Sequence, residues 1–199
     1  MYGAGARRLQ DHFDTRRLAD ALTRHTVHDE LTPDDLDLIG RQTTVWISTV
    51  DADGWPDVSY KGGDTGFVRA VSPTELRIPM YDGNGMMRTL GNVADTGRVA
   101  LLFVDPSVPR RLRLHGTARV STDAGQVAEH AGADAVLIVT PLRIFPNCGR
   151  YIHGDGVLSE HVPRPGTEQP VPSWKLYDWV RDALPERDRD RVARARSEP

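Results

Sequence analysis

The chain has 199 residues, of which 39% are hydrophobic and 27% are charged, and its formal net charge is −3. This size and composition are typical of one globular domain with appended segments, and the charge balance excludes the basic field that would favour nucleic acid as a partner. No stretch approaches the roughly 20 apolar residues of a membrane span and no signal-peptide pattern opens the chain, so we expect a cytoplasmic protein without a membrane partner.

The numbers and positions of cysteine and histidine bear on two further classes of protein, those with internal disulfides and those that bind metal ions. A single cysteine, Cys148, cannot form an internal disulfide, and it suits a reducing compartment. The seven histidines are scattered, and the closest pair, His25 and His28, lies in a polar segment without a cysteine. We therefore expect no metal site.

Residues 1–42 are predicted to form N-terminal helices that pack on the main domain. Apolar residues at helical spacing mark one face of a short helix over residues 14–24. Thr32, followed by a proline and two aspartates, predicts the N-cap and first turn of a second helix. Leu36 and Ile39 are the expected buried side of that helix.

From residue 43 onwards the pattern becomes that of β-strands. Residues 43–50 are rich in β-branched side chains, and residues 56–60 return after an Asp-Gly turn, which predicts a hairpin. A second hairpin is predicted for residues 67–71 and 76–80. Residues 98–104 are apolar almost throughout, which predicts a strand buried on both faces.

The remaining strands complete a mainly β fold with flanking helices (α+β). Residues 112–120 alternate apolar and polar side chains, with Gly116 a candidate bulge. A short helix is expected at 123–131 and a strand at 135–145, which residues 150–153 would extend. Six or seven short strands, mostly in hairpin order, predict a closed antiparallel barrel over residues 43–160.

The composition changes again after the predicted barrel. Residues 161–185 combine a stiff proline-rich linker with a helix that Ser173 would cap and that carries Trp174 and Trp179. Such a helix needs a surface to lie on, either its own barrel or a partner subunit. Residues 186–199 are almost all charged or small, and we expect them to be disordered or loosely helical.

A glycine-rich turn with a helix start follows the strand at residues 76–80. Residues 83–92 contain two closely spaced glycines and lead into apolar residues at helical spacing. Free backbone N–H groups at such a start bind anions, and Arg88, one turn in, could hold two phosphate oxygens. The alternative is a tight turn that needs glycines, beside a solvated arginine.

Three passages, in this order and spacing, resemble the pyridoxamine 5′-phosphate oxidase-like family, the flavin-binding split barrels. They are VSYKGG at 58–63, NGMMRTLGNVADTGRVALLF at 84–103 and RRLRLHG at 110–116. A fourth, RIFPNCGRYIH at 143–153, resembles a signature of one uncharacterised branch. The resemblance implies a six-stranded antiparallel split β-barrel. It also implies a homodimer with FMN in the clefts between the subunits.

The resemblance assigns cofactor contacts position by position. Lys61 matches an FMN-binding lysine and Arg88 the phosphate-binding arginine, with Thr89 where the oxidase has a second basic residue. Arg111 stands where the oxidase uses a glutamine to reach the flavin. The other expected cofactor contacts are Ser59 and Tyr60 beneath the ring, and Gly62, Asn84, Met86, Met87, Asn92 and Asn147.

Several of these residues have a structural alternative. Asn84 and Asn92 also suit helix boundaries, and Met86 and Met87 suit core or dimer packing. Arg111, with its neighbour Arg110, equally suits a surface or interface pair.

Catalytic residues are less defined in the sequence. Arg150 and His153 are weak candidates for facing a substrate, and His153 is the candidate general acid or base of its segment. Cys148 is either a buried small residue or a nucleophile activated by Arg150. The oxidase's C-terminal substrate-phosphate motif has no clear counterpart, so the resemblance gives no support to pyridoxamine phosphate itself as the substrate.

The sequence thus favours an FMN-dependent oxidoreductase acting on an unidentified small organic substrate. A deazaflavin-dependent reductase on the same fold would need a more basic, open groove for that cofactor's acidic tail. A non-catalytic flavin-binding protein would bind FMN without turnover. The few basic residues of the proposed site (Lys61, Arg88, Arg111) fit the single phosphate of FMN better than a polyanionic tail.

Overall fold

The computed structural model describes residues 1–154 and 156–197. The chain divides into two compact units. The larger comprises His28–Asp155, and the smaller combines Met1–Val27 with Gly156–Pro199. The predicted N-terminal group of residues 1–42 is therefore split, because residues 1–27 belong to a different unit from the strands.

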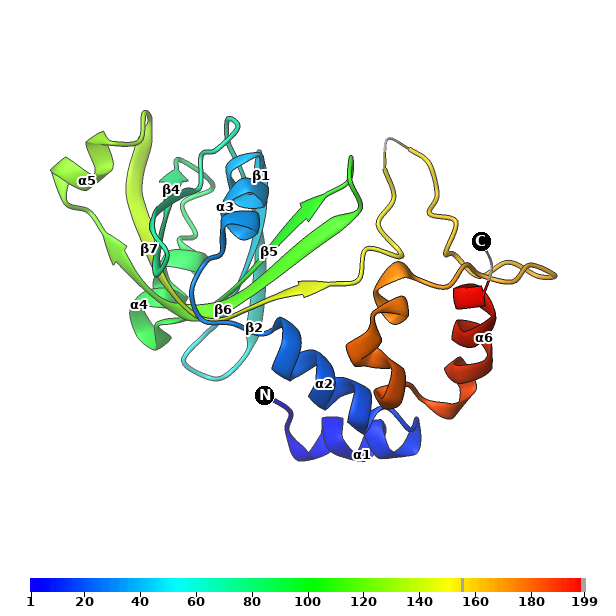
Figure 1. Cartoon of the computed structure of the whole chain (residues 1–199). Helices are drawn as coiled ribbons and strands as arrows, with labels where there is room; N and C mark the ends of the chain where they lie inside the picture. Colours follow the sequence, from blue (N-terminus) through cyan, green and yellow to red (C-terminus); the bar gives the residue numbers. More distant parts are fainter. Residues whose placement is uncertain (155, 198–199) are drawn as a thin grey trace. The chain divides into compact units, whose positions relative to one another are not determined.

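One open sheet of seven antiparallel strands forms the larger unit, in the order β2-β1-β5-β6-β7-β4-β3 (Figure 1). The predicted mainly β, antiparallel fold with flanking helices is confirmed. The sheet has one strand more than the resemblance implied, and its end strands β2 and β3 do not pair, so the barrel is split rather than closed. The strands are β1 (Thr44–Val50), β2 (Pro56–Gly62), β3 (Arg69–Ser72), β4 (Glu75–Tyr81), β5 (Arg98–Asp105), β6 (Arg110–Ser121) and β7 (Ala133–Asn147).

Three helices accompany this sheet: α3 (Pro33–Gly40), α4 (Arg88–Thr96) and α5 (Ala124–Ala128). The predicted start of α3 is confirmed as a capping box. The Asp35 N–H donates to Thr32 Oγ1 (3.3 Å), and the Thr32 N–H donates to Asp35 Oδ2 (2.9 Å). Leu38 and Ile39 form its buried side, and Leu36, which was expected there, is exposed.

Alternating side chains of the strands build the core on one side of the sheet. Strand β5 follows this pattern, since its buried residues alternate with half-buried ones. The expectation that β5 is buried on both faces was therefore wrong. Its other face and that of β1 line an apolar groove of about 340 Å³ with Trp46 and Leu102. The core side chains include Val45, Ile47, Leu76, Ile78, Leu101, Phe103, Leu114, Leu137, Val139 and Ile144.

Strands β6 and β7 are the longest pair, and their register shifts between His115 and Gly116. His115 pairs with Arg143 and Gly116 with Pro141, so the extra residue of the bulge is Leu142 on β7. The predicted irregularity therefore lies beside Gly116, but on the neighbouring strand. A Cβ atom at Gly116 would lie 2.4 Å from the carbonyl oxygen of Thr140, so only glycine permits this close approach of the two backbones. Strand β7 ends at Asn147, and residues 150–153 do not extend it as predicted.

The smaller unit has its own apolar cluster. It contains α1 (Ala4–His12), α2 (Arg16–Thr26), the 3₁₀ segments η1 (Ser173–Leu176) and η2 (Asp178–Ala183), and α6 (Glu186–Ser197). The single predicted helix after the linker is thus two 3₁₀ segments, and the tail expected to be disordered or loosely helical forms α6. The Trp179 ring stacks on His25 of α2 at 4.5 Å, a contact within the smaller unit. The buried residues are Leu18, Val180, Leu184 and Val192.

Within the described ranges 1–154 and 156–197, no helix has both the length and the apolar character that crossing a bilayer requires. The same residues contain no group of three or more histidine, cysteine or acidic side chains placed to hold a metal ion.

Candidate cofactor-binding site

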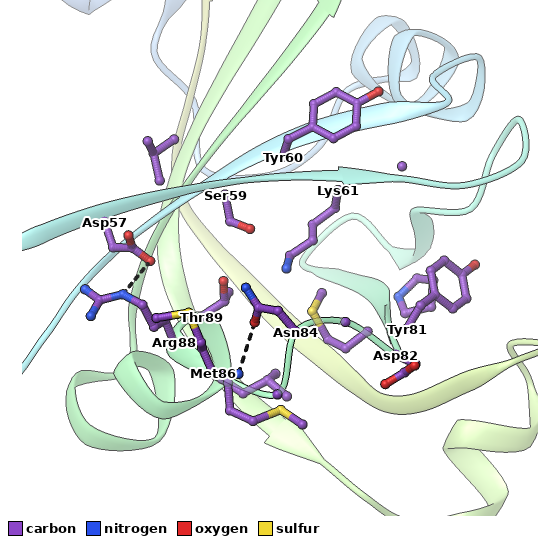
Figure 2. A pocket seen from close by; sticks show the side chains of 18 residues that line it. Asp57, Ser59, Tyr60, Lys61, Tyr81, Asp82, Asn84, Met86, Arg88 and Thr89 are labelled. Carbon is purple, nitrogen blue, oxygen red and sulfur yellow. Dashed lines mark hydrogen bonds and ion pairs between the residues drawn. The ribbon is translucent and has the colours of Figure 1, made fainter.

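A cavity of about 510 Å³ lies between strand β2 and the loop that joins β4 to α4 (Figure 2). It is lined by residues 57–62 and 79–90. Two segments that the sequence singled out separately therefore meet in one pocket. The predicted cofactor residues that line it are Ser59, Tyr60, Lys61, Gly62, Asn84, Met86, Met87, Arg88 and Thr89.

Strand β2 supplies one wall through its two-residue alternation. Asp57, Ser59 and Lys61 share its half-buried face. Figure 2 shows the Ser59 hydroxyl and the Lys61 amine pointing toward the loop across the cavity. The ring of Tyr60 lies on the other face, where it meets Trp46 edge-on at 5.5 Å. Tyr60 therefore borders the pocket mainly through its backbone.

The opposite wall is the loop that precedes α4. The side-chain oxygen of Asn84 accepts a hydrogen bond from the Met86 N–H (3.0 Å), which forms a turn. Gly85 has φ +73° and Met87 φ +52°, so the chain enters α4 through two left-handed residues. Met87, the N-cap, gives no side-chain hydrogen bond to the helix. The first N–H groups of α4 are thus left uncapped by a side chain, as an anion site requires.

Two residues of the first turn of α4 face β2. Thr89 is buried, with 5% of its surface exposed. Arg88 is half exposed, and its Nε lies 3.6 Å from Asp57 Oδ2. Asp57 and Asp82 were not predicted to line the site. Asp57 could have been found from the sequence, because it stands two residues before Ser59 on the same strand face.

Three predicted cofactor contacts lie outside the pocket lining. Asn92 is buried, and its Nδ2 donates to Thr49 Oγ1 on β1 (2.9 Å), which ties α4 to the sheet. Arg111 and Asn147 are neighbours across β6 and β7. The Arg111 Nε and Asn147 Oδ1 atoms are buried, and neither has a hydrogen-bond partner within the described part of the chain. The contact of Asn92, Arg111 and Asn147 with a cofactor stays a prediction.

The candidate catalytic residues Arg150 and His153 do not line this cavity either. Arg150 donates from Nε to Cys148 Sγ (3.2 Å), and its guanidinium lies 5.5 Å from the ring centre of Tyr151. The roles assigned to Arg150 and His153 therefore stay predictions as well.

The charges and the size of the pocket limit what it can hold. Its cations, Lys61 and Arg88, are balanced by two carboxylates, Asp57 and Asp82. Its volume falls in the range of small-molecule sites. The pocket can thus hold a ligand with one anionic group at the start of α4, and it offers little to a long polyanion.

The groove on the other face of β5 has a different chemistry. Trp46 and Leu102 give it an apolar floor, and Arg113 and His115 are at its polar side. Burial lowers the pKa of His115, and the positive charges of Arg113 and Arg143 lower it further. The neutral imidazole is therefore favoured there.

Comparison with protein families decides the affiliation of the chain. The model of the family described as "Pyridoxamine 5'-phosphate oxidase" matches residues 31–144, which is more than half of the sequence. The chain belongs to the pyridoxamine 5′-phosphate oxidase family. The match spans α3 and strands β1 to β6 with most of β7, and it contains both walls of the pocket. Comparison with curated proteins gave no match.

Comparison with solved structures finds several that resemble part of this chain. HupZ of group A Streptococcus is 25% identical over 58% of this chain and 93% of its own, with a TM-score of 0.49. A putative pyridoxamine 5′-phosphate oxidase of Lactobacillus delbrueckii is 24% identical over 59% of this chain and 95% of its own, with the same TM-score. HutZ of Vibrio cholerae, described as a heme storage protein, is 20% identical over 58% and 94%, with a TM-score of 0.42. Likeness at this level carries no information on the cofactor of this chain.

Proposed function

We propose that this protein is an FMN-dependent oxidoreductase that acts on a small organic substrate. The observation that carries the proposal is the meeting of Lys61, Arg88 and the uncapped start of α4 in one pocket of a pyridoxamine 5′-phosphate oxidase family member. FMN, when bound, supplies hydride or electron transfer, for which a protein needs few acids or bases.

Different residues of the pocket would bind different parts of this cofactor. The N–H groups at the start of α4 and the Arg88 guanidinium would bind the phosphate. Lys61 and Ser59 face the same cavity from β2, so they present a positive charge and a hydroxyl to the rest of the ligand. A positive charge there favours the anionic reduced form of the ring.

The balance of charge in the pocket supports FMN over a deazaflavin. The carboxylates of Asp57 and Asp82 offset the positive charges of Lys61 and Arg88. The pocket therefore has no excess positive charge that could bind the acidic tail of a deazaflavin. The deazaflavin-dependent reductase and the non-catalytic flavin carrier become outcomes of the experiment below.

We further propose a cytoplasmic homodimer with the cofactor at the subunit interface. Supporting it is the apolar groove on β1 and β5, whose residues Trp46 and Leu102 are part of a sheet face that an isolated larger unit would leave to water. Leu102→Glu should shift the protein from dimer to monomer in light scattering. A dimer that persists would move the interface elsewhere.

The first experiment is an absorption spectrum of the purified protein, with mass spectrometry of what heat releases. Released FMN, together with weaker FMN binding by Arg88→Ala, supports the proposal. A colourless protein that takes up a deazaflavin and not FMN selects the deazaflavin reductase. Tight FMN binding without reduction by NADH or NADPH indicates a flavin carrier. A protein that takes up neither cofactor overturns the assignment of the pocket.

A further inference from the structure

Arg88, which the proposed function assigns to the cofactor phosphate, forms an ion pair with Asp57. Arg88 Nε lies 3.6 Å from Asp57 Oδ2. Figure 2 shows the guanidinium turned toward Asp57, at the end of the pocket away from Lys61. The carboxylate therefore takes up part of the charge that a phosphate would use.

Carboxylate and phosphate bind a guanidinium through the same N–H fork, and an arginine in a protein keeps its charge. We propose that Asp57 is a specificity-determining counter-ion. Asp57 pairs with Arg88 until a phosphate-bearing ligand binds. The phosphate of the ligand then takes the place of the Asp57 carboxylate at the guanidinium. This inference rests on the proposed function, because it takes Arg88 as the phosphate ligand.

The geometry of the ion pair would let a phosphate displace Asp57 from Arg88, and it would not prevent phosphate binding. The separation of 3.6 Å between Arg88 Nε and Asp57 Oδ2 is longer than a hydrogen bond, and the side chains are 49% (Arg88) and 25% (Asp57) exposed. Exposed pairs of this kind are weak, whereas a phosphate can engage two N–H groups at once. The pair therefore lowers phosphate affinity severalfold and does not abolish it.

Strand β2 keeps Asp57 in this position. Asp57 pairs with Thr49 in the ladder with β1, and it shares the pocket face with Ser59 and Lys61. Its carboxylate therefore stays near the start of α4 when a ligand arrives. A ligand without a phosphate does not need Arg88, so its affinity is independent of Asp57.

Binding of FMN and of riboflavin, which lacks the phosphate, separates this effect from a structural one. The dissociation constants of both are measured by titration at low salt for the wild type, Asp57→Asn and Asp57→Glu. Asp57→Asn should bind FMN about two- to fivefold more tightly, with riboflavin unchanged. Asp57→Glu keeps the charge and should stay close to the wild type.

Two further variants test the mechanism. With Arg88→Ala as background, Asp57→Asn should no longer tighten FMN binding. Asp82→Asn removes the same charge from the same pocket without touching the pair. If Asp82→Asn tightens FMN binding as much as Asp57→Asn, the effect belongs to overall charge and the exchange is rejected. Weaker FMN binding by Asp57→Asn also rejects it.

Failure of the proposed function gives a different result. A wild-type protein that binds neither FMN nor riboflavin refutes the cofactor assignment. Inorganic phosphate, titrated while the Arg88 Nε–H signal is followed by NMR, then tests the exchange alone. Movement of that signal toward its position in Asp57→Asn retains the exchange, and a signal that does not move refutes it.

Discussion

Asn92→Ala should lower the stability of the larger unit and leave FMN affinity nearly unchanged. Asn92 and Thr49 are 7% and 2% exposed, and their hydrogen bond of 2.9 Å joins α4 to β1. Removing the amide loses a bond worth about 0.5–1.5 kcal/mol and leaves the Thr49 hydroxyl buried without its donor. The expected loss is about 1–3 kcal/mol in the free energy of unfolding, or roughly 2–4 °C in Tm for each kcal/mol.

The assay is urea unfolding of the wild type, Asn92→Ala, Thr49→Val and the double variant, each also titrated with FMN. Both single variants leave one buried polar group unpaired, and the double variant removes both groups. The double variant should therefore lose less stability than the sum of the two, by about 1 kcal/mol. Unchanged unfolding together with loss of FMN binding would refute this reasoning. It would support the cofactor contact that the sequence predicts for Asn92.

Other regions give further expected outcomes. Gly116→Ala should destabilise the larger unit by about 1–3 kcal/mol in chemical denaturation, because its Cβ meets the Thr140 carbonyl; an unchanged midpoint would show that the bulge can relax. Leu184→Ala should cost the smaller unit about 2–5 kcal/mol, visible as faster amide exchange in α2 and α6 while the strands keep their protection. Burial, followed by the charge of Arg69, lowers the pKa of His130, so the folded state binds a proton less readily than the unfolded chain. The stability from its neutral ring should be complete above about pH 6.5 and fall as the pH drops below that value, and His130→Gln should flatten this slope in Tm.

Local patterns in the sequence were enough to predict most of the elements of the larger unit. Two-residue alternation marked the strands, and the capping box at Thr32 and Asp35 marked the start of α3. The glycine-rich turn before Arg88 predicted a strand–turn–helix passage, which the structure confirms. These patterns depend on interactions between residues close in sequence, so they can be recognised without knowledge of the tertiary structure.

Predictions that depend on distant contacts were less successful. The apolar run of β5 indicates burial without saying which face is covered, and only the sheet shows that its second face lines a groove. Trp179, after the linker, stacks on His25 of α2, a contact across more than 150 residues that no local pattern reveals. Helix propensity also fails to separate a helix from the short 3₁₀ segments found there.

The candidate site shows the same limit. Lys61 and Arg88 were grouped through the family resemblance, and the structure places both in one pocket. The alternation of β2 could have placed Asp57 on the face of Ser59, but its contact with Arg88 could not be foreseen, because that contact depends on how β2 faces α4. The hydrogen bond of Asn92 to Thr49 was also not foreseen, because it joins side chains 43 residues apart. The contact of Asn92 with a cofactor stays a prediction.

The edge position of β2 also limits how this site can change in evolution. Its ladder with β1 places Ser59 opposite Ile47 and Lys61 opposite Val45. Because side chains alternate, insertion or deletion of one residue ahead of Ser59 within the strand would turn the hydroxyl and the amine to the outer face and bring Tyr60 inward. Length variation among descendants should therefore be confined to the hairpin turn at residues 51–55, while the strand changes by substitution alone.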